Sequence, residues 1–539
     1  MAKFEQTAID KLVGIFSPRA ALGRVSARAS MSLLTGGGGA AHSGASAIRR
    51  AFRSWGVTGG DANADNLPES ETLRARTRDL YRNNLIARAA IRTVRTNVVG
   101  SGLRLNAQID REFLGLTDEQ AEDWERTVER EFCLWAESQF ADATLTGNFY
   151  ELQALVFLST LQSGDCFALL PWVRHKGCPY DLRVQLVEAD RVCNKNFGMD
   201  TDACAGGIEV DGYGAPTRYW FCTPHPGAVS VKPRVWQGIP AFGTRTARRN
   251  VLHLFDRERP EQRRGLPYLA PVIEPLKQLG RYTEAELMAA VVSGMFTVFI
   301  ETENGDGLDG AGLDTLDAGA AGVPGGQDEY KLGAGAIIGL APGEKANAPN
   351  PGRPNTAFDP FVQAIIRQIG AGLEIPFELL MKHFSASYSA SKAALLEAWK
   401  FFRHRRDWLV HSFCAPVYAE WLTEAIIKGR VNAPGFLEDH AVRAAYLGAE
   451  WVGPTMGQID PLKEVQAAKM RIDETLTTRS REAAELTGAD FERVAARRGR
   501  EEKMRKQYDL QPPELPGAAP TGAARAKKTE GGADDEPAD

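Results

Sequence analysis

A serine and a lysine lie three residues apart in the stretch Ser389-Ala-Ser-Lys392. This S-x-x-K spacing is the nucleophile motif of penicillin-binding enzymes, where a neighbouring base helps to remove the serine proton. Such enzymes also carry S-D-N and K-T-G triplets, and this sequence contains neither. A cytoplasmic serine hydrolase that uses Ser389 and Lys392 is therefore kept only as the alternative function.

No other catalytic motif is complete. Gly333-Ala-Gly335 starts like a dinucleotide-binding loop, but G-x-G-x-x-G is not completed and no helix pattern follows. The sequence also lacks a G-x-x-x-x-G-K-[ST] loop, an H-E-x-x-H pair and any C-x-x-C pair, and its seven cysteines fit reduced thiols in a cytoplasm. We therefore predict a protein that is not an enzyme and has no metal site and no cofactor.

Basic side chains indicate a second kind of chemistry, the attraction of phosphate groups. Lys382 and His383 stand in a loop-like stretch, and a basic face follows on the next predicted helix. That face consists of Lys392, Lys400, Arg403, Arg405 and Arg406. Because the formal net charge of the 539-residue chain is −5, any contact with nucleic acid must be weak, local or steric.

Two predicted helices position these residues. Apolar side chains recur at helical spacing from Phe358 to Leu373, and two glycines and Pro376 then end the pattern. A second helix should begin near Ser389 or Ser391, whose hydroxyls suit an N-cap, and should kink at Pro416. An apolar loop joins the two helices, so a helical hairpin in a large core is the plainest interpretation.

Two further arginine groups leave alternatives open. Arg74, Arg78 and Arg82 share one face of an earlier predicted helix, which could meet an acidic or nucleic-acid partner, or could be a solvated face or subunit contact. The string RP-x-Q-x-RG around Arg259 and Arg264 could bind phosphate, or could form a polar turn before a helix.

The order of these elements resembles that of the portal proteins of tailed bacteriophages, in their lambda-like branch. The resemblance rests on a helix, then IPFELLMKHFSASYSASKAALLEAW, then a long basic-aromatic helix. It extends to RNNLIARAAIRTVRTNVVGSGLRL, to HLF-x-x-x-RP-x-Q-x-RG-x-P with Arg259, Gln262, Arg264 and Gly265, and to PTMGQIDPLKE and RSREAAELTGADFERVAARRGREE near the C-terminus. Together these motifs cover roughly Leu67 to Tyr508.

The resemblance implies an α+β portal fold with a mixed α/β wing, a helical stem, a clip insertion, a tunnel loop and a helical C-terminal crown. Short strand-like runs between Cys166 and Phe255 predict a small mixed sheet in the wing. The expected parts are a flexible N-terminal arm (1–66), the wing (67–265), the first stem helix (266–293), the clip (294–356), the second stem helix (357–374), the tunnel loop (375–390), the long wing helix with the segment after it (391–450), the crown (451–508) and a disordered tail (509–539).

The resemblance also implies a structural function. The chain would form a dodecameric ring at one capsid vertex of a tailed phage or prophage, and double-stranded DNA would be packaged and ejected through it without sequence specificity. Its other partners would be the terminase large subunit, head-completion or connector proteins, and capsid and scaffolding proteins. It would be located in the virion, and in the host cytoplasm during assembly.

Two expectations follow for particular segments. Lys382, His383, Ser385 and Ser387 of the tunnel loop would face the DNA channel, while Phe377, Leu379, Leu380 and Met381 would anchor the loop to neighbouring helices. We expect no membrane partner, because the longest apolar run, Leu287 to Ile300, is too short to span a bilayer.

Overall fold

The structure is a computed structural model with two compact units, Met1–Asp65 and Asn66–Asp539. It describes residues 17–34, 50, 54–57, 59–294, 298–300, 337–339, 357–384, 387–457, 460–488 and 491–510, together with Ile9, Val13 and Ile15. The first unit contains helix α2 (Pro18–Leu34). Most of the predicted clip, most of the predicted tail and parts of the predicted N-terminal arm lie outside the described residues. Within those residues, none of the helices is both long and apolar enough to cross a membrane.

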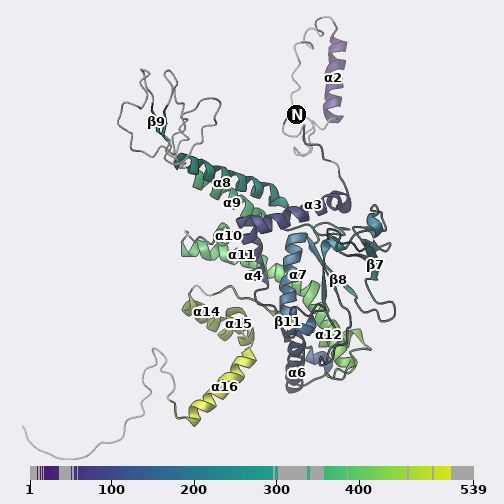
Figure 1. The fold of residues 1–539 in the computed structure, drawn as a ribbon, viewed down its shortest axis with the longest axis vertical. Helices are drawn as coiled ribbons and strands as arrows, with labels where there is room; N and C mark the ends of the chain where they lie inside the picture. Colours follow the sequence, from purple (N-terminus) through teal and green to yellow (C-terminus); the bar gives the residue numbers. More distant parts are fainter. Residues whose placement is uncertain are drawn as a thin grey trace, which may run out of the picture. The chain divides into compact units, whose positions relative to one another are not determined.

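The second unit begins with helices that build the main core of the wing. Asn84 caps helix α4, because its side chain accepts hydrogen bonds from the backbone N–H groups of Ile86 and Ala87. The apolar face of α4 is buried, and it continues into a cluster in which the ring of Phe132 lies 5.1 Å from that of Trp421. These helices are α3 (Ala62–Asn83), α4 (Leu85–Val98), α5 (Arg111–Leu114), α6 (Asp118–Ala136) and α7 (Phe149–Ser163) (Figure 1).

Three small antiparallel sheets complete the wing. The first has the order β3 (Gln185–Glu188), β2 (Asp165–Leu169), β8 (Val251–Phe255), and the second has the order β4 (Cys204–Ala205), β5 (Ile208–Val210), β6 (Pro216–Thr223), β7 (Val235–Pro240). The third pairs β1 (Arg104–Ala107) with β11 (Ala449–Val452). The prediction of a mixed sheet in the wing is therefore wrong. Consecutive strands such as β6 and β7 are joined by a loop, residues 224–234, that contains no helix, whereas parallel pairing needs a longer crossover connection.

Two helices form the stem and run side by side away from the wing (Figure 1). Helix α9 (Phe358–Gly372) begins where the apolar pattern predicted, and Tyr282 of α8 (Ile273–Gly294) stacks on Phe358 with ring centroids 5.7 Å apart. Helix α8 begins at Ile273 rather than at residue 266, because Pro267 and Pro271 lack the N–H that a helix interior needs. Strands β9 (Val298–Ile300) and β10 (Ile337–Gly339) pair in parallel within the range predicted as the clip.

After α9 the chain forms a short helix, a loop and a long helix. Helix α10 (Phe377–Met381) is followed by α11 (Tyr388–Leu409), whose N-cap is Ser387 rather than Ser389 or Ser391. A π-helical turn (Val410–Cys414) joins α11 to α12 (Ala415–Ile427). Pro416 lies in the first turn of α12, directly after this wider turn, and the kink at Pro416 stays a prediction.

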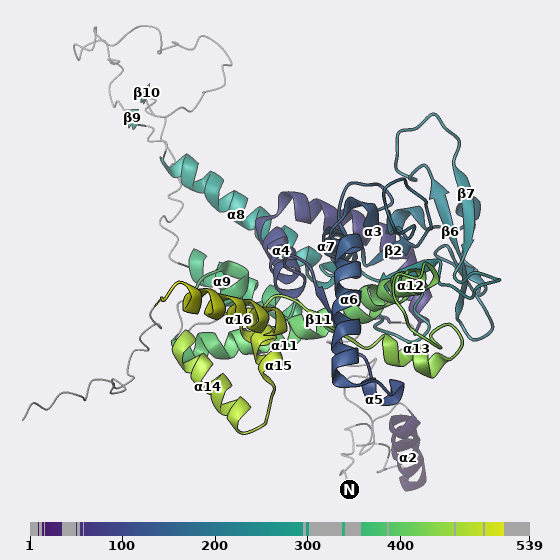
Figure 2. The same ribbon diagram turned by 90° about the horizontal axis from the view of Figure 1, so that it is seen from below.

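Four more helices follow α12. Asp460 caps α14 with Pro461 at the first helical position, as its sequence predicted. The helices are α13 (His440–Tyr446), α14 (Pro461–Asp473), α15 (Arg479–Thr487) and α16 (Phe491–Gln507). Both ribbon views show α14 and α15 near α11, and α16 packs against α15 (Figure 2).

Candidate channel loop and basic surfaces

Helix α10 attaches the predicted tunnel loop to the wing. Leu380 is buried, and Phe377 and Leu379 pack half-buried against the main core. Met381, which the sequence predicted as a fourth anchor, is 41% exposed, because α10 is a single turn and its last residue points away from the core. Three of the four predicted anchors therefore contact the wing, and Met381 does not.

The exposed part of the loop begins at Lys382. This residue has a positive φ of 53° and ends α10, and the backbone N–H of His383 donates to the carbonyl of Glu378. Both side chains are exposed, and Lys382 makes no ion pair among the residues that the structure describes. Ser387 caps α11 by accepting from the N–H of Ala390, whereas Ser385 lies outside the described residues. A channel-facing position for these residues stays a prediction.

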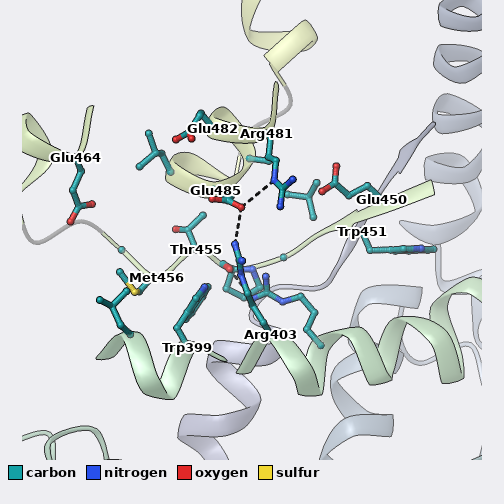
Figure 3. Close-up of a pocket in the computed structure, with 18 of the residues that line it drawn as sticks. Trp399, Arg403, Glu450, Trp451, Thr455, Met456, Glu464, Arg481, Glu482 and Glu485 are labelled. Atoms are coloured by element: carbon teal, nitrogen blue, oxygen red, sulfur yellow. Dashed lines mark hydrogen bonds and ion pairs between the residues drawn. The ribbon is translucent and has the colours of Figure 1, made fainter. Parts of the chain in front are cut away.

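The predicted basic face of α11 is largely neutralised inside the chain. Lys392 pairs with Glu464 at 3.3 Å, Lys400 with Glu397 at 2.7 Å, Arg403 with Glu485 at 2.8 Å, and Arg405 with Asp256. Figure 3 shows Arg403 reaching from α11 to Glu485 on α15, which Arg481 also contacts. Lys392 and Arg403 hold α14 and α15 against α11, whereas Lys400 pairs within α11 and Arg405 reaches the segment after β8. Because each of these cations faces a carboxylate, they do not form a strongly positive surface.

Arg406, the last residue of the predicted basic face, binds backbone carbonyl groups. Its guanidinium donates to the carbonyls of Asn97 and Val98 at the C-terminal end of α4, and to that of Pro454, at 2.8 to 3.1 Å. A cation is favourable at a helix C-terminus, where unpaired carbonyls carry partial negative charge. Burial nevertheless lowers the pKa of Arg406 to about 10. Arg406 therefore ties α4 and α11 to the segment after β11.

The same region contains a cavity of about 920 Å³ between α11, β11, α14 and α15. Trp399, Arg403, Glu464 and Glu485 contribute to its walls (Figure 3). Lys392 also lines it, and its ammonium is engaged by Glu464. Because the Lys392 ammonium is engaged by Glu464 on α14, the geometry gives no support to the hydrolase alternative.

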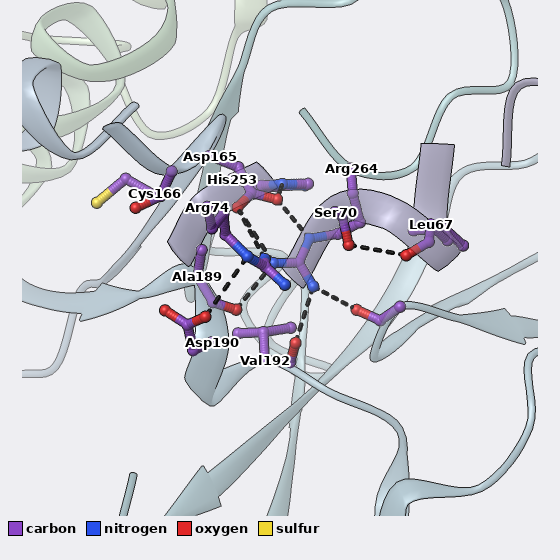
Figure 4. A network of polar contacts seen from close by, with 12 residues as sticks. Leu67, Ser70, Arg74, Asp165, Cys166, Ala189, Asp190, Val192, His253 and Arg264 are labelled. Atoms are coloured by element: carbon purple, nitrogen blue, oxygen red, sulfur yellow. Dashed lines mark hydrogen bonds and ion pairs between the residues drawn. The ribbon is translucent and has the colours of Figure 1, made fainter. Parts of the chain in front are cut away.

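The RP-x-Q-x-RG string forms a polar turn with a buried centre (Figure 4). All five N–H donors of Arg264 are used: they reach both oxygens of Asp165 and the carbonyls of Ala189, Val192 and Gly206. Gln262 supports the turn by donating to the carbonyl of Arg264. Because Arg264 has no donor left for a ligand, the phosphate-binding alternative is not supported.

Asp165 is the acidic partner that the sequence analysis did not single out. Burial alone would raise the pKa of this carboxyl, but the Arg264 guanidinium and the hydrogen bond from His253 hold it well below its usual range. Burial lowers the pKa of His253, more than its contact with Asp165 raises it. The strand-like context of Asp165 gave no signal that it meets Arg264, which lies far along the chain.

The arginine stripe of α3 joins the same network. Arg78 contacts Asp190 at 2.5 Å and Arg74 contacts it at 3.5 Å, while Arg74 also lies 4.0 Å from Asp165. The stripe therefore holds α3 to the sheets, as a contact within the wing. Gly265 permits the close approach of its turn, since a Cβ at this position would lie 2.1 Å from the carbonyl oxygen of Gly164.

The second unit is thus an α+β body with the paired helices α8 and α9 and an exposed loop between α10 and α11. Residues 49–406 match the family model described as phage portal protein, lambda family. The chain belongs to this family. Phage portal proteins are structural components of the virion.

Individual relatives agree with the family match. Portal protein B of Escherichia phage lambda is 28% identical over 495 residues, covering 89% of this chain and 92% of that protein. The portal protein of Escherichia phage N15 matches with the same identity and coverage. A chain in the virion of a native gene transfer agent particle is 14% identical with a TM-score of 0.37, covering 78% of this chain and 93% of that chain.

Proposed function

We propose that the chain is one subunit of a dodecameric ring at a single capsid vertex, through which duplex DNA enters and leaves a phage or prophage head. Its function is structural, with no catalytic step of its own. The terminase large subunit would dock on the ring during filling, head-completion or connector proteins would dock afterwards, and capsid and scaffolding proteins would surround it. Assembly would take place in the host cytoplasm.

The observation that carries the proposal is an exposed apolar stripe on the stem. Leu287, Met288 and Val291 of α8 are 66%, 58% and 47% exposed, and Phe361 of α9 is 50% exposed. Apolar surface of this kind is stabilised when a partner covers it. A head-to-tail contact between identical stems, repeated around an axis, would cover the stripe in each copy and close a ring.

Particle mass tests the proposal directly. Wild-type protein should form particles near twelve times the 58.8 kDa of one chain, as measured by mass photometry and negative-stain imaging. Leu287→Glu combined with Val291→Glu should shift the mass to small species, because charged groups cannot be buried unpaired in the interface. Phe113→Glu, at a residue that is 57% exposed on α5, is the matched control and should still form rings. A wild-type protein that stays monomeric at every salt concentration would overturn the proposal.

A further inference from the structure

One long stretch of the wing contains bases but no acids. Between Gly212 and Phe255 there are six lysines and arginines and no aspartate or glutamate, in a chain whose net charge is −5. The stretch contains β6, β7 and the turn after them. In both ribbon views these strands lie on the far side of the second unit from α8 (Figure 2). The wing therefore has a positive region that is separate from the stem.

The two faces of this sheet differ in composition. Tyr219, Phe221 and Ala241 point into a buried cluster with Ile208 and Val251. Side chains alternate along a strand, so the residues between them lie on the opposite, outer face. Arg218, Trp220, Trp236 and Phe242 have this outer parity. From Trp236 to Phe242 the face extends about 20 Å.

Aromatic rings hold the cations of the outer face. Arg234 lies 5.9 Å from the ring centroid of Phe197, Lys195 lies 5.4 Å and Arg218 lies 5.8 Å from that of Trp220, and Arg249 lies 5.0 Å from that of Phe242. We name Lys195, Arg218, Arg234 and Arg249 with their rings the cation–ring row. Phe197 also packs edge-on against Trp236 of β7.

Contact with an aromatic ring does not neutralise the positive charge of these side chains. An aromatic ring attracts a cation through its quadrupole but carries no net charge. Arg218 is also paired with Glu209 at 3.5 Å, whereas Lys195, Arg234 and Arg249 have no carboxylate partner among the described residues. Lys232 and Arg245 add two exposed cations nearby, likewise without an ion pair in the described part of the chain.

We propose that the cation–ring row is a second DNA-binding surface, on the wing and outside the channel, which holds the phosphate backbone of duplex DNA. The row offers a line of fixed positive charges, which suits a uniform polyanion. Each ring already lies beside one of the row's own cations, so we assign the binding to the charges and not to the stacking of bases on the rings. Binding should therefore be independent of sequence, because phosphate contacts carry no base information.

The inference rests on the proposed function only for the identity of the nucleic acid. Its test uses the full chain and a fluorescein-labelled duplex of random sequence, with affinity measured by anisotropy between roughly 50 and 200 mM salt. The variant Lys195→Gln/Arg234→Gln/Arg249→Gln removes three unpaired cations. The control Arg126→Gln/Lys463→Gln/Arg497→Gln removes three exposed cations that are paired with Glu122, Asp460 and Glu501.

The row variant should bind about tenfold or more weakly at low salt, and the slope of log affinity against log salt should fall by about 2.7, or 0.9 for each lost phosphate contact. The control, with the same change in net charge, should change affinity by less than about twofold. Particle mass and thermal melting of both variants should match wild type, which separates this result from any failure of ring assembly.

An unchanged DNA affinity and salt slope in the row variant would overturn the inference. The same conclusion holds if the row variant loses binding to poly-L-glutamate and keeps its binding to DNA, because the partner would then be an acidic protein surface. A control variant that weakens DNA binding as much as the row variant would also overturn it, since net charge alone would explain the effect.

Discussion

The basic face of α11 and the cation–ring row on the wing use the same residue types with opposite electrostatic results. On α11, carboxylates and backbone carbonyls surround the cations, as Glu485 does for Arg403 and Pro454 does for Arg406. On the row, Arg234 and Arg249 lie over the rings of Phe197 and Phe242. The first arrangement uses charge to join elements, and the second leaves it available to a partner. A cluster of lysines and arginines is therefore informative about binding only once its counter-groups are known.

The largest expected loss of stability comes from removing Arg264, whose guanidinium donates all its hydrogen bonds to oxygen atoms inside the wing. Arg264→Ala should lower the free energy of unfolding by about 3–5 kcal/mol, because the buried carboxylate of Asp165 would lose its two-point partner and keep only the longer contacts with His253 and Arg74. Urea unfolding followed by tryptophan fluorescence measures this change. Arg234→Ala, on the row, should cost less than about 1 kcal/mol. Equal losses of unfolding free energy in Arg264→Ala and Arg234→Ala would contradict the difference between oxygen-bound and ring-bound cations.

A buried member of the α11 face should show the next largest effect. Arg406→Ala should lower the free energy of unfolding by about 2–3 kcal/mol, since three carbonyl groups lose a charged donor. Arg406→Lys should recover only part of this loss, because an ammonium lacks the planar fork that reaches several carbonyls. Full recovery by lysine in the same urea assay would show that charge alone matters at this position.

Lys382 extends the comparison to the loop after α10, because it too is exposed without an ion pair in the described residues. Lys382→Glu should leave ring mass unchanged and reduce DNA packaging by about tenfold, with a dependence on salt. An in vitro packaging assay with preassembled rings measures the effect. Normal packaging and full-length DNA retention at low and high salt would remove the channel role of Lys382, and failure of ring assembly would make the loop a subunit contact.

The network of Asp165 and His253 should make the wing sensitive to acid. The pKa of each group is lowered in the folded state, so the unfolded chain binds both protons more readily. Stability is then lost as pH falls, first through about 6.5 for His253 and later below about 3.9 for Asp165. Between about pH 8 and pH 5 the free energy of unfolding should fall because His253 takes up its proton more readily in the unfolded chain, and His253→Gln should flatten that part of the profile. A steeper profile in the variant would contradict this assignment.

The smallest effect is expected for an exposed ion pair on α11. Arg403 and Glu485 have side chains that are 50% and 41% exposed. Arg403→Ala should therefore lower the free energy of unfolding by less than about 1 kcal/mol, and the difference should shrink at high salt. A double-mutant cycle with Glu485→Ala measures the pair itself. A coupling energy well above this limit would mean that the contact between α11 and α15 is stronger than its exposure indicates.

Local features of the sequence were enough to predict several elements and the family. The apolar spacing from Phe358 and the Asp460-Pro461 start each define one helix, because helix periodicity and capping depend on residues within a few positions of one another. The order of motifs led to the portal family, which the match over residues 49–406 confirms. The start of α11 was misplaced by a few residues, because three nearby serines could each serve as its N-cap and only Ser387 does.

The tertiary structure alone decided which charges remain available. Arg264 meets Asp165 and Arg405 meets Asp256 across long stretches of chain, and no local pattern links such partners. The row has the same origin, since Lys195 comes to the ring of Trp220, and Arg234 to that of Phe197, from separate segments. The sequence by itself determined the helical patterns of α9 and α14, the net charge and the acid-free stretch before Asp256. Whether a given cation is neutralised depends on groups within a few ångströms of it in space, and folding selects those groups from the whole chain.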